Sequence, residues 1–387
     1  MLDLGFFCAK RVFEMTPLNE LTHTVDSALV NSKAAPTMPY DIRAEIDWLD
    51  FSCTANPLGA PDSVRRAIMA AVVEGDLSYT PNRDGSHLAN VLGRYYEMPA
   101  ACFLAGTSTQ QMIRAIAQTY RFCNVAVPMP CPASYLLALT NAGHNAIKLA
   151  SPFDTLVMDP SFAFAHDQRF TAAVLANPGY PTGRLLSEET LIKYLDACDW
   201  VIVDESHIKL SIGAESFVNL VSKHRNLLVV RSVSTDLGMP GIPMGYIVGA
   251  PELIARIAKF GDGGELGMFH EVVARQLPSL YDYELRTQAL LESEIPWMQC
   301  MLSLVPGIKV CPSESNFVMC TLSSAASRNL GIDCASALVA RMQKRGFSML
   351  DLTGTPGVAD ERSFLVCVRS REDNQAFIDA LKSALFE

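Results

Sequence analysis

The sequence predicts an α/β protein with a mostly parallel central sheet flanked by helices and a smaller α+β domain in the C-terminal third. Between about residues 64 and 250, short apolar runs alternate with helical stretches, and many of these runs are rich in β-branched residues. Strands that are apolar on both faces and alternate with helices form a parallel sheet covered on both sides. After about residue 290 the pattern changes to short strands around one helix, which indicates a second domain.

The chain of 387 residues is 49% hydrophobic and 19% charged, which is typical of a globular protein and excludes a disordered one. At this length a single core stops growing, so two domains are expected. We expect an N-terminal arm at 1–45 that contributes to the small domain, a large domain at 46–285 and a small domain at 286–387. The net charge of −10 argues against sequence-independent binding of nucleic acid.

The 11 cysteines form no C-x-x-C pair, so neither a zinc site nor a redox motif is expected, and no metal is predicted. Free thiols in a reducing cytoplasm are the simplest interpretation. The first residues lack the pattern of a signal peptide, and no apolar run is long enough to span a membrane. We therefore expect a cytoplasmic protein with no membrane partner.

The elements of the large domain can be predicted one by one. Ser187, followed by two glutamates, is typical of a helix N-cap. The predicted helices lie at 64–75, 86–96, 134–143 and 187–198. The predicted strands lie at 123–129, 146–150, 171–178, 200–206, 226–234 and 246–250, with a short one at 103–105.

Polar side chains follow several of these strands, at the edge where open α/β sheets bind ligands. Thr107, Ser108 and Thr109 open a helix after the strand at 103–105, and such a start can hold a phosphate on backbone N–H groups. The other candidates at strand ends are Asn177, Tyr180, Asp204, His207, Ser232, Ser234 and Thr235.

The order and spacing of these pieces resemble the fold-type-I pyridoxal-phosphate enzymes, which include the class I and II aminotransferases. Histidinol-phosphate aminotransferases and threonine-phosphate decarboxylases look most similar. The resemblance covers roughly residues 48–385. The segments that carry it are LDFSCTANPLGAP (49–61), SYTPNRDG (78–85), NPGYPTG (177–183), VDESH (203–207) and SESNFV (313–318).

The resemblance implies a role for several of these residues. Asp204 would pair with the pyridine nitrogen and keep the ring protonated as an electron sink. Asn177 would face the cofactor's 3-oxygen, as would His207, although an ordinary polar histidine is an equal alternative. Tyr79 would reach a phosphate across the interface of a homodimer. The remaining cofactor-pocket positions are Thr107, Ser108, Thr109, Tyr180, Ser232 and Ser234.

The resemblance breaks where the family carries its Schiff-base lysine. The family pattern is Ser-x-Ser-Lys, then an Arg shortly before Gly-Tyr, and the stretch RSVSTDLGMPGIPMGY (231–246) aligns with it without a gap. Thr235 stands at the lysine position and Pro243 at the phosphate-binding arginine position. A threonine cannot form the Schiff base or shuttle its proton at neutral pH, and a proline has neither charge nor a backbone donor.

Two further positions of the same site also depart from the family. Pro132 stands where an aromatic ring stacks on the pyridine, and Leu365 aligns with the arginine that binds the substrate carboxylate. Leucine cannot replace a bidentate arginine. Arg362 and Arg369 lie nearby, but neither fits the position without a gap. These substitutions make the cavity less cationic, which disfavours a doubly charged ligand.

We therefore expect no covalent pyridoxal phosphate, although its aldehyde or amine form could be held non-covalently. The first hypothesis is a repurposed small-molecule enzyme that works without an internal aldimine. The second is a non-catalytic homologue that acts as a binding or regulatory subunit. The third is an ordinary aminotransferase or decarboxylase whose lysine has moved, for which Lys209 and Lys259 are the candidates.

Overall fold

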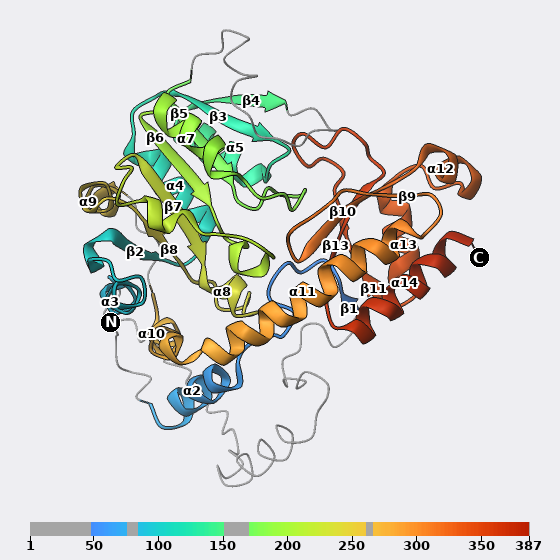
Figure 1. Ribbon diagram of the computed structural model, residues 1–387, viewed down its shortest axis with the longest axis horizontal. Coiled ribbons are helices and arrows are strands. Elements are labelled where there is room, and N and C mark those ends of the chain that lie inside the picture. The colour runs from blue at the N-terminus through green and yellow to red at the C-terminus, as the bar shows by residue number, and fades with distance from the viewer. Residues whose placement is uncertain (1–47, 76–83, 151–169, 261–265, 387) are drawn as a thin grey trace, which may run out of the picture. The chain divides into compact units, whose positions relative to one another are not determined.

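A computed structural model of the protein describes residues 48–75, 84–150, 170–260 and 266–386 (Figure 1). The larger of its sheets has seven strands in the order β2-β8-β7-β6-β5-β3-β4. These strands are β2 (Phe103–Gly106), β3 (Asn124–Met129), β4 (Asn145–Ala150), β5 (Ala172–Ala176), β6 (Trp200–Asp204), β7 (Leu227–Ser232) and β8 (Gly245–Val248). All neighbouring pairs are parallel except those of β8, which runs antiparallel to β2 and β7.

Both faces of this sheet are buried, as the apolar runs predict. In β5, Ala173 and Leu175 join one hydrophobic cluster, while Ala172 and Val174 join another on the opposite face. The first cluster also takes residues from α2 (Asp62–Val73), α3 (Ser86–Tyr95), α7 (Glu188–Ala197) and α10 (Met268–Gln276). The second takes residues from α4 (Thr109–Thr119), α5 (Ala133–Asn141) and α9 (Pro251–Phe260). The predicted fold class is confirmed.

The N-terminus of α7 is stabilised by side chains that are close to it in the sequence. The Ser187 hydroxyl accepts the backbone N–H of Thr190 at 3.2 Å, and Glu188 and Glu189 occupy the first turn of α7. Acidic side chains at a helix N-terminus are stabilised by the helix dipole. The predicted N-cap is therefore confirmed.

A second, antiparallel sheet lies in the C-terminal part. Its order is β12-β13-β10-β9, formed by Leu350–Asp351, Ser363–Cys367, Phe317–Leu322 and Ile308–Val310. The helices α12 (Ser324–Leu330), α13 (Ala335–Gln343) and α14 (Arg371–Phe386) belong to the same part of the chain. The short strand β1 (Leu49–Asp50) pairs in parallel with β11 (Phe347–Ser348). Residues at the start of the range predicted for the large domain thus pair with the small domain; the predicted arm at 1–45 lies outside the described residues.

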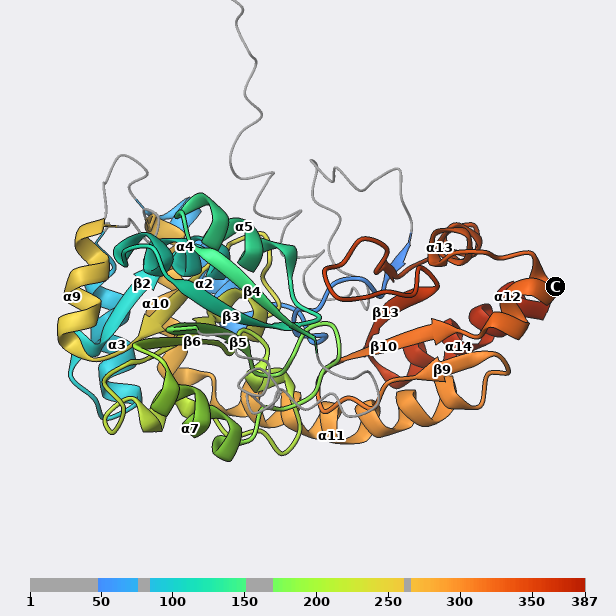
Figure 2. The same ribbon diagram turned by 90° about the horizontal axis from the view of Figure 1, so that it is seen from above.

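The helix α11 (Tyr281–Ser303) serves both hydrophobic cores (Figure 2). Its first turn places Tyr283 in a cluster of the large domain, whereas Leu291, Ile295 and Met298 belong to the core of the small domain. The expected boundary at 285/286 therefore falls inside a continuous helix rather than in a linker.

Over the part of the chain that the structure describes, no helix is both long enough and apolar enough to cross a membrane. The ten cysteines in the same residues are all free thiols. No cluster of potential metal ligands occurs within the described ranges.

Candidate functional site

A cavity of about 570 Å³ lies at the carboxyl ends of β5 and β6, the edge where ligands bind in open α/β sheets. Its size is in the range of small-molecule sites. The lining residues from the large domain are Thr109, Gln110, Ile113, Pro132, Ala133, Ser134, Tyr135, Ala176, Pro178, Tyr180, Asp204, Ser206, His207 and Thr235. Thr54 and the segment 353–356 complete the lining.

Asp204 ends β6 and carries the carboxylate of this cavity. Its Oδ1 accepts the backbone N–H of Ser206 at 2.9 Å and also the Ser206 hydroxyl. Its Oδ2 accepts the Tyr135 hydroxyl at 2.6 Å. Burial, with Asp204 as a second cause, raises the pKa of Tyr135 well above its usual range, so this hydroxyl stays a proton donor. The carboxylate is thus fixed in position by two side chains and one backbone group.

His207 follows Asp204 by three residues and lines the same cavity. Its Nε2 lies 2.9 Å from the Thr54 hydroxyl, and its ring meets Phe317 edge-on with centroids 5.4 Å apart. Burial lowers the pKa of His207, although the nearby Asp204 opposes this shift. A neutral imidazole in hydrogen-bond contact with a hydroxyl can accept a proton, which gives the cavity a potential general base.

Thr235 lies in the lining, in the short helix α8 (Val233–Asp236) that follows β7. Its hydroxyl is 2.8 Å from the Ser232 hydroxyl, which also accepts the Thr235 N–H at 3.1 Å. Ser234 is buried behind them, 3.2 Å from Ser232 between hydroxyl oxygens. These three hydroxyls form a hydrogen-bonded cluster at the position that we predict for the family's amine.

The predicted phosphate-binding segment opens α4. Thr109 lines the cavity, but the Ser108 side chain caps the helix by accepting the Gln111 N–H at 3.2 Å. The Thr107 hydroxyl bonds to the side chain of Gln111. The cap uses one of the N–H groups that could otherwise hold an anion.

Tyr180 lines the cavity, whereas Asn177 is not among its lining residues. The Asn177 side chain is 1% exposed and accepts the Leu186 N–H at 2.9 Å, while it also hydrogen-bonds Glu205. It is not among the lining residues, so a contact with a cofactor 3-oxygen stays a prediction. Tyr180 does line the cavity, and burial raises its pKa to about 12.

Pro243 and Leu365, which we predict to stand at the positions of two family arginines, have different surroundings. Pro243 is exposed, and its carbonyl lies 3.1 Å from Nε2 of His270. Leu365 is fully buried in β13 and belongs to a cluster with Phe317 and Met319. Arg362 pairs with Asp360, and Arg369 with Asp373, so neither arginine is directed to the cavity.

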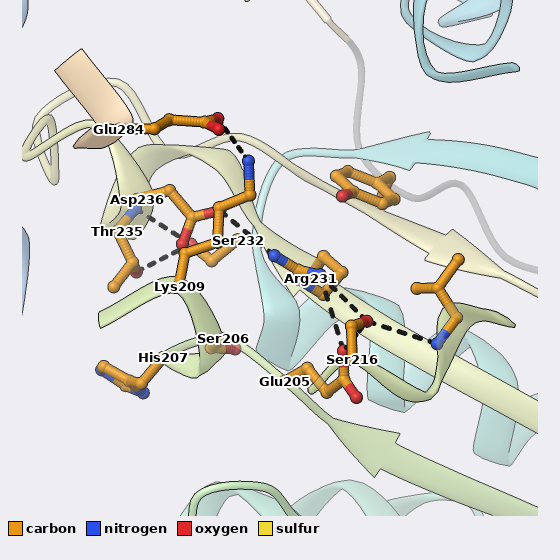
Figure 3. Close-up of polar contacts among 12 residues, drawn as sticks. Glu205, Ser206, His207, Lys209, Ser216, Arg231, Ser232, Thr235, Asp236 and Glu284 are labelled. Atoms are coloured by element: carbon orange, nitrogen blue, oxygen red, sulfur yellow. Dashed lines mark hydrogen bonds and ion pairs between the residues drawn. The ribbon is translucent and has the colours of Figure 1, made fainter. Parts of the chain in front are cut away.

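Lys209, one of the two candidates for a relocated amine, lies in a second cavity of about 150 Å³. Figure 3 shows its side chain extending toward Glu284, with which it forms an ion pair of 2.5 Å. Burial alone would lower the pKa of Lys209, but Asp236 and Glu284 outweigh it and raise the pKa. This lysine therefore stays protonated. The other candidate, Lys259, is exposed on α9.

Next to Lys209, Arg231 is 1% exposed and pairs with two carboxylates, Glu205 at 3.5 Å and Asp236 at 3.6 Å. Burial raises the pKa of Asp236 to about 6 from its ordinary 3.8, against the opposing effect of Arg231. The folded state therefore binds more protons at Asp236 than the unfolded state between pH values of about 4 and 6. The free energy of unfolding should fall as the pH rises through that window.

We expect Asp236→Asn to remove this dependence. Relative to the wild type, the variant should gain roughly 3 kcal/mol in free energy of unfolding as the pH rises from about 4 to about 7. Urea unfolding at several pH values measures the difference. Asp196→Asn, at an exposed position of α7, is the control and should show no such trend. If the difference in free energy of unfolding between Asp236→Asn and the wild type does not change with pH, burial does not destabilise the ionised carboxyl of Asp236.

Several residues of the lining were not predicted as site residues from the sequence. Tyr135 lies on an apolar helix, where a tyrosine is indistinguishable from a core residue, and Thr54 follows the first short strand. The segment 353–356 comes from the small domain. A predicted contributor, Tyr79, lies outside the described residues.

The comparisons with known proteins identify the family. The sequence model of the aminotransferases of class I and II matches residues 46–381, and the chain belongs to this family. A putative threonine-phosphate decarboxylase from Caldanaerobacter subterraneus subsp. tengcongensis is 26% identical over 334 residues, which cover 84% of this chain and 88% of the relative. A histidinol-phosphate aminotransferase from Roseiflexus castenholzii is 27% identical over 344 residues, covering 86% and 89%.

Solved structures show the same fold. The histidinol-phosphate aminotransferase from Clostridium acetobutylicum superposes with a TM-score of 0.77 at 20% identity, covering 87% of this chain and 99% of that one. The L-threonine-O-3-phosphate decarboxylase from Porphyromonas gingivalis gives a TM-score of 0.76 at 21% identity, covering 88% and 100%. The enzyme from Sinorhizobium meliloti, solved in complex with pyridoxal-5'-phosphate, gives 0.76 at 17% identity, covering 92% and 98%.

The residues present do not suit the family cofactor well. Asp204 could still face a ring nitrogen, but the described lining contains neither a lysine nor an arginine. The amine that would hold the aldehyde and the cation that would hold the phosphate are both missing from it. No reaction step is therefore derived through pyridoxal phosphate.

Proposed function

We propose that this chain is a repurposed small-molecule enzyme, of amino-acid-derived or specialised metabolism, that uses the aminotransferase cavity without an internal aldimine. The observation that supports the proposal most is the hydroxyl cluster of Thr235, Ser232 and Ser234, at the position that we predict for the Schiff-base amine. Asp204 would orient a ligand, and His207 with Thr54 would accept or donate a proton.

The two alternative functions are an ordinary aminotransferase or decarboxylase with a relocated lysine and a non-catalytic binding subunit. A relocated lysine is disfavoured because the side chain of Lys209 is paired with Glu284 and that of Lys259 is exposed. A non-catalytic binding subunit would keep the same cavity but needs no proton acceptor in it. A half-buried His207 in contact with a hydroxyl favours the enzyme over the binding subunit.

An absorbance scan of the purified protein tests the proposal. No aldimine band should be present, and none should develop after addition of pyridoxal phosphate. The histidinol-phosphate aminotransferase from Clostridium acetobutylicum, treated in the same way, serves as the comparison. An aldimine band in the protein as purified would contradict the proposal.

We also propose a homodimer. Large apolar side chains are exposed on α2 (Val73, 63%), α3 (Tyr95, 52%) and α11 (Tyr281, 70%), and such surfaces are typical of subunit interfaces. Light scattering at micromolar concentration should give twice the mass of one chain. A monomer at that concentration would contradict the homodimer and would also remove Tyr79 from the site.

A further inference from the structure

One residue sets the formal charge of the cavity lining that the structure describes. Among the described residues that line it, Asp204 is the only one with a formally charged side chain at neutral pH. The other polar lining groups are hydroxyls, one amide and the His207 imidazole. Because burial lowers the pKa of His207, the imidazole adds no positive charge at neutral pH. A ligand in this cavity therefore faces a carboxylate and no protein cation from the described residues.

Two basic side chains of neighbouring segments pair with other acids. Arg184 pairs with Glu314 at 2.9 Å, and Lys209 pairs with Glu284 at 2.5 Å. The N-termini of α4 and α5, at Thr109 and Ala133, also line the cavity and add positive potential. A helix N-terminus is equivalent to about half an elementary charge. Each of these two N-termini is therefore weaker than the full charge of the Asp204 carboxylate.

The Asp204 carboxylate can still accept a hydrogen bond. A carboxylate offers about four acceptor sites. Three of them are used, by the N–H and hydroxyl of Ser206 and by the hydroxyl of Tyr135. These three donors are neutral, so they hold the carboxylate in place without neutralising it. A carboxylate that is removed from water gains most from a cationic donor.

We infer that the cavity binds a ligand that presents a protonated amine to Asp204 and that carries no phosphate or carboxylate. This inference rests on the proposed function, because it names the substrate class of the same cavity. The arginines and the lysine that we expect in the family's site would select a negatively charged ligand. The ligand inferred for this cavity carries the opposite charge. Tyr180, Pro132, Pro178 and Ile113 supply apolar surface for the carbon skeleton of such an amine.

Two probes that differ only in a phosphate test the inference. Pyridoxamine carries a protonated aminomethyl group, and its 5'-phosphate adds a dianion to the same ring. Calorimetric titration of the wild-type protein should show that pyridoxamine binds at least about tenfold more tightly than its phosphate ester, as the loss of one charge-assisted contact would produce. Equal or tighter binding of the phosphate ester would overturn the inference, as would no binding of pyridoxamine at millimolar concentration.

Variants of charged positions make the test specific. Asp204→Asn should weaken pyridoxamine binding about 10- to 100-fold. The exposed control Asp196→Asn should leave binding unchanged, and an equal loss in both variants would overturn the inference. If Asp204→Asn does not fold, Gln110→Lys places a cation at an exposed part of the lining instead. Gln110→Lys should weaken pyridoxamine binding and strengthen binding of the phosphate ester; an unchanged ratio would overturn the inference.

These results are separable from a failure of the proposed function. An internal aldimine with pyridoxal phosphate would contradict the proposed function, whatever the charge preference of the cavity. A preference for the phosphate ester without any aldimine would contradict only the amine ligand.

Discussion

Replacing Thr235 by lysine is expected to let the protein form a Schiff base with pyridoxal phosphate that the wild type does not form. Thr235 lines the cavity together with Asp204, so a lysine at this position brings an amine to the cavity that the described lining lacks. After incubation with the aldehyde and reduction with borohydride, intact-mass analysis should show one pyridoxyl group per chain in Thr235→Lys.

Labelling by pyridoxal phosphate should depend on where the new amine lies in the cavity, and not only on the presence of an amine. Gln110→Lys adds a lysine to another part of the same lining and is the matched control. It should be labelled more slowly and incompletely, because Gln110 is exposed on α4, whereas position 235 follows β7, the neighbour of the strand that ends at Asp204. Equal labelling of the two variants would indicate ordinary reaction of an accessible lysine. It would mean that position 235 is not the equivalent of the family's lysine.

A large loss of stability is expected from Arg231→Met. Arg231 is 1% exposed and lies between Glu205, which is 0% exposed, and Asp236 (Figure 3). Burial already raises the pKa of Glu205, and Arg231 is the first of the groups that lower it again. Removing one partner of a buried ion pair leaves an uncompensated charge, which costs about 3–5 kcal/mol. Chemical unfolding at neutral pH measures this loss.

The exposed pair Arg225–Glu252 provides the control, because its side chains are 78% and 48% exposed. Arg225→Met should change the free energy of unfolding by at most about 1 kcal/mol. In the double variant Arg231→Met/Glu205→Gln, the buried carboxylate disappears together with its cation. It should therefore recover part of the stability lost in Arg231→Met. A loss in Arg231→Met no larger than in Arg225→Met would contradict the buried network.

The fold was largely predictable because its dominant signal is local. Strands such as β5 are buried on both faces and therefore consist of consecutive apolar residues. The Ser187 cap can be recognised from four consecutive residues. The domain boundary was not predictable in the same way. Helix α11 places Tyr283 in one core and Leu291 in another, and the apolar period of a helix does not reveal which core each residue enters.

The candidate site could be predicted in part. Asp204, His207 and Thr235 follow strands, and the structure brings all three to one cavity. Tyr135, which donates to Asp204, lies on a helix whose pattern is that of a core element. The Asn177 side chain accepts the backbone N–H of Leu186, a contact that the NPGYPTG motif does not encode, and its contact with a cofactor stays a prediction.

The central claim is that this cavity works without a lysine-bound cofactor. Its most direct test is borohydride reduction of the wild-type protein, before and after incubation with excess pyridoxal phosphate, followed by intact-mass analysis and peptide mapping. The account predicts no stoichiometric pyridoxyl adduct in either sample. A stoichiometric adduct on a single lysine, whether Lys209, Lys259 or another, would contradict it and would identify a working aminotransferase or decarboxylase whose catalytic amine has moved.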